Sequence, residues 1–143
     1  MLEVALRDTL LARLDASRTV LLGAIQGLTE HDFAAVLDGE VGGGQTVAQA
    51  LAALAEAERR ENAEVRGEPV IAPGTGRPLA PQVVHALAGA SYRSRRYLED
   101  PAADASSARA LVDGVVEREA SLAERIRNRP PTQPPPVFPM AGR

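Results

Sequence analysis

Few side chains of this sequence could act as nucleophiles, general bases or metal ligands. The chain contains no cysteine, so disulfides and thiolate metal sites are excluded. Its two histidines, His31 and His85, could join Asp or Glu side chains in a mixed metal site. The alternative is that both histidines are exposed or lie near helix ends, and we favour it. We therefore expect no metal or other cofactor.

Sequence motifs of known reaction types are also missing. The chain has no Gly-x-Ser-x-Gly motif, and no pair of carboxylates stands out as a catalytic acid and base. The glycine run within Asp38 to Gly44 lacks the spacing and the lysine of a phosphate-binding loop, so we interpret it as a connection. The sequence therefore names no catalytic residue.

One segment is locally basic, Tyr92-Arg93-Ser94-Arg95-Arg96-Tyr97. Aromatic side chains beside arginines occur in nucleic-acid interfaces, but on a helix these six residues spread around the axis. The net charge of the chain is -3, which also argues against a general nucleic-acid binder. We predict a solvated or partner-facing surface and no nucleic-acid partner.

Length and composition indicate one helical domain. Aromatic residues make up 3% of the 143 residues and Trp is absent, so Leu, Val, Ile and Ala must build the core. Such a composition favours closely packed helices over a β-sandwich. No signal peptide is visible, and no apolar run reaches the ~20 residues that a membrane span needs. We expect a cytoplasmic protein that does not contact membranes.

Apolar residues at helical spacing predict four helices. The first runs from about Leu2 to Leu28, with Arg18 among the residues off its apolar face, and Thr29 caps a short turn after it. The second begins at Thr46, which forms a capping box with Gln49, and fades near residues 65–67. The apolar faces of these helices comprise Leu6, Leu10, Leu14, Leu21, Ile25 and Leu28, then Val47, Ala50, Leu51, Leu54 and Ala57.

The last two helices follow a Pro- and Gly-rich loop over residues 67–80. The third helix begins near Pro81 and ends near Asp100, and the fourth begins within residues 104–107 and ends near Asn128. Their predicted inner faces comprise Val84, Leu87, Ala88, Ser91 and Leu98, then Leu111, Val112, Val115, Leu122 and Ile126. The pattern predicts an antiparallel, up-down four-helix bundle over residues 1–129.

A proline-rich tail occupies residues 130–143. Its five prolines within residues 130–136 predict an extended, polyproline II conformation. Val137, Phe138 and Met140 could dock in a groove of the bundle or of a neighbouring subunit; the alternative is a disordered terminus.

Three segments carry a resemblance to a known family. They are the Leu28-Thr29-Glu30-His31-Asp32-Phe33 turn, the helix from Gln45 to Glu58, and the segment from Glu117 to Ile126. In this order and spacing they resemble the DinB-like (YfiT-like) superfamily of four-helix bundles. The resemblance covers about residues 10–129 and implies a homodimer, which the Ala-rich helix faces would permit.

In that superfamily, three histidines commonly bind a divalent metal for thiol-dependent transfer, isomerisation or hydrolysis. The resemblance places the three ligand positions at Ala53, Arg118 and Leu122. Ala and Leu have no lone pair to donate, and an Arg guanidinium is a fixed cation that repels metal. If the motif is aligned one residue earlier in the last helix, Glu117 and Ser121 take the places of Arg118 and Leu122. Of these two residues, only one is a good metal ligand.

Arg118 lies on or beside the inner face of the fourth helix and needs a partner if it is buried. Glu56 and Glu119 are the candidate partners. Arg118 could border the core and extend its head to water. Alternatively, it could fill the vacated metal pocket and either close it with a salt bridge or bind a small anion.

The functional expectation is a metal-free relative whose catalytic site has been lost. It would act as a small-ligand-binding or interaction protein, with the stress response as its expected setting and with Ala53, Glu56, Arg118, Glu119 and Leu122 around the degenerate pocket. The rival is a metal- or thiol-dependent transferase or hydrolase with an unconventional site. An enzyme should have a polar, accessible pocket between the second and fourth helices, whereas a degenerate member should have it packed with Ala, Leu and the Arg118 stem.

Overall fold

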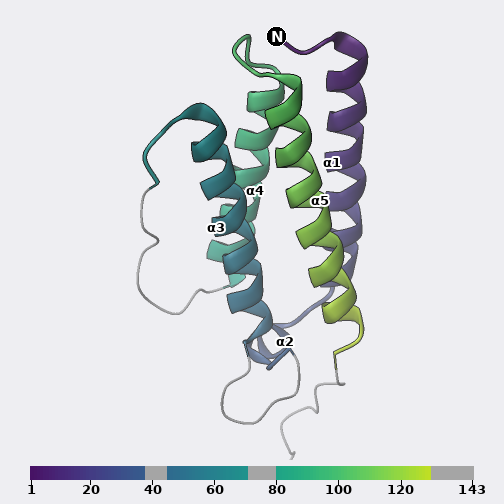
Figure 1. The fold of residues 1–143 in the computed structure, drawn as a ribbon. Coiled ribbons are helices and arrows are strands. Elements are labelled where there is room, and N and C mark those ends of the chain that lie inside the picture. The colour runs from purple at the N-terminus through teal and green to yellow at the C-terminus, as the bar shows by residue number, and fades with distance from the viewer. Residues whose placement is uncertain (38–44, 71–79, 130–143) are drawn as a thin grey trace, which may run out of the picture.

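The computed structural model describes residues 1–37, 45–70 and 80–129, and this part of the chain is helical. It contains α1 (Val4–Ile25), α2 (Glu30–Ala34), α3 (Val47–Arg66), α4 (Ala80–Leu98) and α5 (Ala105–Arg127). The four long helices form a bundle, and α2 is a short turn at one end of it (Figure 1). The predicted all-α class is confirmed. The predicted glycine-rich connection, most of the predicted loop at 67–80 and the tail lie outside the described residues.

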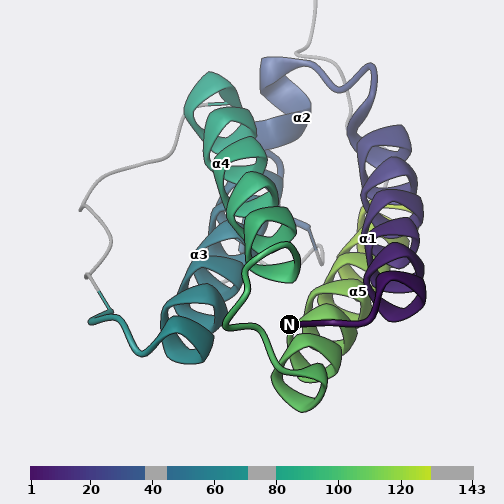
Figure 2. The same cartoon turned by 90° about the horizontal axis from the view of Figure 1, so that it is seen from above.

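Contacts between helices establish their directions. Seen from above, α1 lies beside α5 and α3 beside α4 (Figure 2). Along α1 and α5 the ion pairs advance together, from Arg13–Asp113 to Arg18–Glu119, so these helices are parallel. The contacts of α3 with α4 advance in the same way: Asn62 with Ser94, then Arg66 with Tyr97.

The bundle therefore consists of two parallel pairs that run in opposite directions (Figure 1). The predicted strict up-down alternation is wrong at α3 and α4, because these consecutive helices run in the same direction.

Local signals explain where the helices begin and end. Thr46 accepts a hydrogen bond from the backbone of Gln49, and the Gln49 side chain accepts one from the Thr46 backbone, which confirms the predicted capping box. A second capping box at Thr29 begins α2, and Asp104 caps α5. Gly67 ends α3 with φ 65°, a left-handed conformation that glycine adopts without strain.

The predicted apolar face of α5 is buried, and that of α3 is buried except at Ala57, which is partly exposed; the predicted face of α4 is rotated. Val84 is 45% exposed and Ala88 is also exposed, whereas Val83 is 1% exposed. The buried residues of α4 are Val83, Leu87, Ala90, Ser94, Tyr97 and Leu98. Apolar residues recur at three- and four-residue steps on both faces of this helix, so its own sequence does not distinguish them.

The core is divided into two apolar clusters. One surrounds Leu21, Leu51 and Leu122 near the α2 end, and the other surrounds Leu14 and Leu111 near the opposite end. Buried polar side chains are found in three of the four long helices: Glu58 and Asn62 in α3, Ser94 in α4, and Glu119 in α5. No helix in the described part is long and apolar enough to cross a membrane.

Candidate functional site

Arg18 interrupts the apolar face of α1 at the boundary between the two clusters. It follows Leu14 by four residues and precedes Leu21 by three, which places all three side chains on one face. Its side chain is 15% exposed. The prediction that Arg18 lies off the apolar face is therefore wrong. Arg18 lies on that face, between the core residues Leu14 and Leu21.

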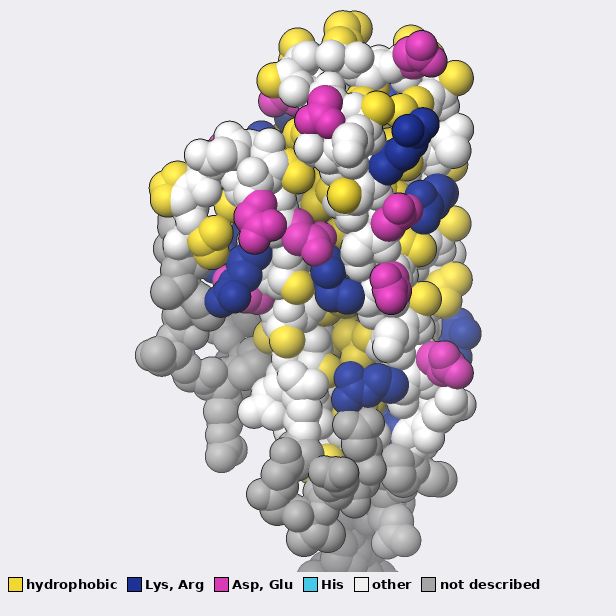
Figure 3. All heavy atoms as spheres, in the orientation of Figure 1, with side chains coloured by type: hydrophobic (Ala, Val, Ile, Leu, Met, Phe, Trp, Pro, Cys, Tyr) yellow, Lys and Arg dark blue, Asp and Glu magenta, His cyan; other side chains and the backbone are white. Residues whose placement is uncertain are grey.

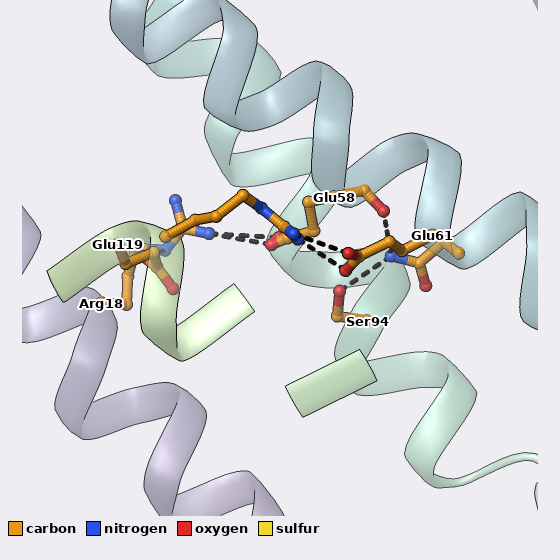
Figure 4. A network of polar contacts seen from close by, with 7 residues as sticks. Arg18, Glu58, Glu61, Ser94 and Glu119 are labelled. Carbon is orange, nitrogen blue, oxygen red and sulfur yellow. Dashed lines mark hydrogen bonds and ion pairs between the residues drawn. The ribbon is translucent and has the colours of Figure 1, made fainter. Parts of the chain in front are cut away.

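Two buried carboxylates share this guanidinium. Arg18 Nη2 lies 3.0 Å from Glu58 Oε1 of α3, and Arg18 Nε lies 3.0 Å from Glu119 Oε2 of α5. The side chains of Glu58 and Glu119 are 4% and 1% exposed. Figure 4 shows these groups converging from three helices. We call Arg18, Glu58 and Glu119 the polar layer.

The polar layer contains two carboxyl groups but only one guanidinium, and burial shifts the pKa of both carboxyl groups. Burial raises the pKa of Glu58 from 4.5 to about 7; attraction by Arg18 opposes this rise and repulsion by Glu119 adds to it. Burial also raises the pKa of Glu119. The layer therefore takes up a proton near neutral pH, which leaves one carboxylate to balance Arg18.

A hydrogen-bonded pair extends the layer toward α4. Asn62 Nδ2 donates to the backbone carbonyl of Glu58 at 2.9 Å and to Ser94 Oγ at 2.8 Å. The Asn62 side-chain amide oxygen is buried and has no hydrogen-bond partner within the described protein. Buried polar atoms of this kind are commonly satisfied by ordered water.

Arg118 pairs with Glu61 of α3, and its positive charge also acts on Glu58 and Glu119 of the polar layer, where it lowers the pKa of both carboxyl groups against the larger rise caused by burial. Its Nη1 lies 2.6 Å from Glu61 Oε1, and its Nη2 lies 2.6 Å from Glu61 Oε2. This hydrogen bond raises the pKa of Arg118. Gly114 makes room for the pair, because a Cβ there would lie 3.0 Å from Glu61 Oε1 and 3.3 Å from Arg118 Nη1.

The predicted partners of Arg118 are therefore wrong. Glu119 follows Arg118 directly, and successive helix residues point about 100° apart, so Glu119 faces Arg18 instead. Glu56 is engaged within its own helix, 2.7 Å from Arg59 and 3.3 Å from Arg60. Because α3 and α5 run in opposite directions, Glu61 of α3 lies opposite Arg118 of α5 and pairs with it.

The three positions that the resemblance assigns to metal ligands do lie together. Ala53, Arg118 and Leu122 line a pocket of about 230 Å³ between α3 and α5. The rest of the lining comprises Gln45, Ala50, Leu54, Ser121 and Arg125. Two predicted site residues lie elsewhere: Glu119 belongs to the polar layer, and Glu56 lines a hollow between α3 and α4.

This lining does not fit a metal ion. Ala53 and Leu122 have no donor atoms, and Arg118 is held as a cation by Glu61. Across the described ranges, no group of three or more His, Cys, Asp or Glu side chains is arranged to hold a metal. His31 in α2 and His85 in α4 are both exposed. Two guanidinium groups beside a serine instead favour an anion.

The basic segment of α4 does not form one surface. Ser94 and Tyr97 are buried, Tyr92 is 62% exposed, and the Arg95 guanidinium pairs with Asp15 of α1. On the face drawn in Figure 3, acidic and basic side chains alternate, with no large patch of one sign.

The sequence contained a signal for the polar layer that the prediction did not use. In α1, α3 and α5 a charged residue lies three, four or seven residues from core residues of the same helix. These are Arg18 between Leu14 and Leu21, Glu58 after Leu51 and Leu54, and Glu119 between Val115 and Leu122. Charges at the same height on three inner faces indicate a buried network, because an isolated buried charge is strongly unfavourable.

Comparison of the chain with family models, with curated proteins and with solved structures finds no match. The resemblance to the DinB-like superfamily is therefore carried by the three segments of the sequence alone.

Proposed function

We propose that this chain is a catalytically degenerate, metal-free DinB-like bundle that binds a small anion in the pocket between α3 and α5. One observation carries the proposal: Arg118 Nε is buried and has no hydrogen-bond partner within the described residues, at a pocket that Arg125 also lines. A buried N–H without an acceptor is costly, and an anion would satisfy it. The stress-response role is carried over from the resemblance alone.

Arg118 is oriented for this task by its contact with Glu61. The terminal nitrogens of Arg118 hold the Glu61 carboxylate at 2.6 Å, which fixes the plane of the guanidinium. Its Nε is buried and has no hydrogen-bond partner among the described residues, and Ser121 adds a hydroxyl to the lining of the pocket. Ala53 leaves open the space that an imidazole would occupy at this position.

The size of the pocket limits the ligand. Its volume of about 230 Å³ is below the roughly 300–1,000 Å³ of typical small-molecule pockets. The lining combines cationic groups with the apolar side chains of Ala50, Ala53, Leu54 and Leu122. A small organic acid suits both features, with its charge on Arg118 and its carbon atoms against the apolar wall.

Calorimetric titration with acetate, propionate and butyrate at constant ionic strength tests the proposal. We expect saturable binding that Arg118→Gln and Ala53→Leu each reduce, because the first removes the cation and the second fills the pocket. Arg127→Gln is the matched control, since Arg127 is an exposed arginine of α5 that does not line the pocket. Equal weakening by the control, or no saturable binding to any acid, would reject the site.

A metal- or thiol-dependent transferase or hydrolase is the second candidate, and the accessibility of the pocket favours it. If Ala, Leu and the Arg118 stem filled this site completely, no pocket of about 230 Å³ would remain. Elemental analysis of the purified protein, with thermal melts in zinc, nickel and manganese, separates the two candidates. Stoichiometric metal or a melt raised by several degrees would favour the enzyme.

The resemblance also supports a homodimer, which we include in the proposal. Light scattering coupled to size-exclusion chromatography measures the mass of the particle directly. A monomer at all protein concentrations would remove the dimer from the proposal and leave the pocket unaffected.

A further inference from the structure

We infer that the hollow between α3 and α4 is a separate binding site for a phosphate group, either inorganic phosphate or a phosphomonoester. The hollow has a volume of about 200 Å³, and its polar lining is Glu56 and Arg59 from α3 with His85 and Arg93 from α4. None of these side chains lines the pocket between α3 and α5, so this inference does not depend on the proposed function.

Helical spacing places the α4 groups around one point. His85, Gly89 and Arg93 follow one another at four-residue steps and therefore share a face, with Gly89 between the two basic side chains. A Cβ on Gly89 would meet no atom within 4 Å, so this position opens onto free space. Long side chains in a helix lean toward its N-terminus, which carries Arg93 over Gly89.

The charge of the hollow is positive once its internal pairing is counted. The Glu56 carboxylate is neutralised by Arg59 at 2.7 Å and by Arg60 at 3.3 Å. The Arg93 side chain makes no hydrogen bond or ion pair with the described residues; its backbone carbonyl accepts a bond from Arg66. Arg93 therefore brings a guanidinium that is not engaged elsewhere, and His85 adds a ring N–H donor.

A phosphate group matches these features better than a carboxylate does. A tetrahedral oxyanion can accept hydrogen bonds from several directions at once, and the guanidinium fork of Arg93 can bind two of its oxygens. The small side chains of Ala55, Ala86 and Ala90 allow the anion to approach the helix surfaces. The rest of a phosphomonoester would extend from the open side of the hollow into solvent.

A titration with inorganic phosphate, followed by two-dimensional amide NMR at constant ionic strength, tests the inference. We expect the amide signals of Gly89 and Ala90 to shift and saturate at millimolar phosphate. Arg93→Gln should weaken binding about five-fold or more, because it removes a charge-assisted contact. Gly89→Leu should abolish it by filling the hollow, and a thermal melt of that variant checks that it folds.

Two controls test whether phosphate binds in this hollow and not elsewhere on the surface. Arg96→Gln removes an exposed arginine of the same helix outside the hollow, and should leave the affinity within about two-fold because distant exposed charges are screened. Arg118→Gln should leave the Gly89 shift unchanged even if it abolishes acid binding between α3 and α5. Equal losses in the Arg93 and Arg96 variants, an unsaturable shift, or stronger binding of acetate than of phosphate would each overturn the inference.

Discussion

The polar layer should make the stability of this protein depend on pH, and Glu58 should be the main cause. The pKa of Glu58 rises from 4.5 to about 7 on folding, because burial disfavours its charged form. The folded state therefore binds more protons than the unfolded state between these two values. The contribution of Glu58 to stability is fully present below pH 4.5 and is lost as the pH rises through 7.

The size of the effect follows from the same two values. A tenfold change in proton affinity corresponds to about 1.4 kcal/mol, so the rise in the pKa of Glu58 corresponds to about 3 kcal/mol between pH 4.5 and pH 8. Small domains are stable by only about 5–15 kcal/mol, so a loss of this size is easily measured.

Glu58→Gln isolates the contribution of this carboxyl group. The new amide oxygen can still accept a hydrogen bond from Arg18, but the side chain cannot ionise. The variant should therefore lose less stability than the natural protein between pH 5 and pH 8, and the raised pKa of Glu119 accounts for the loss that remains. Its stability relative to the natural protein should therefore be about 2–3 kcal/mol greater at pH 8 than at pH 5.

Urea unfolding followed by circular dichroism at pH 5, 6.5 and 8 measures these free energies. Glu64→Gln is the matched control, because Glu64 is an exposed glutamate of the same helix, and its pH profile should follow that of the natural protein. A constant difference between the natural protein and the Glu58→Gln variant at all three pH values would refute the reasoning.

Two further predictions concern the core. Arg18→Met leaves two buried carboxylates without their cation and should cost about 3–5 kcal/mol, whereas the triple change Arg18→Met, Glu58→Leu and Glu119→Leu should be at least as stable as the natural protein in urea unfolding. A triple variant as unstable as the single one would contradict this account. In α4, Val83→Ala should cost about 1.5–3 kcal/mol because Val83 is 1% exposed, whereas Val84→Ala should change stability by less than about 0.5 kcal/mol. Equal costs in thermal or urea unfolding would show that the assigned face of α4 is wrong.

The sequence by itself determined the helices and most of their buried faces. Capping is a local interaction, so Thr46 with Gln49 and Asp104 with the next turn mark helix starts without reference to the rest of the fold. The apolar face of α5 was also predictable, because its buried residues recur at three- and four-residue steps between charged ones.

Tertiary structure decided the direction of α4, its buried face and the charge pairs. The two apolar faces of α4 differ little in composition, so packing against α3 and the buried hydrogen bond from Asn62 to Ser94 select one of them. The partner of Arg118 could not be predicted from distance along the chain, since Glu61 lies 57 residues away. Ion pairs between helices depend on which helices are neighbours and on their relative direction, and neither property is local in sequence.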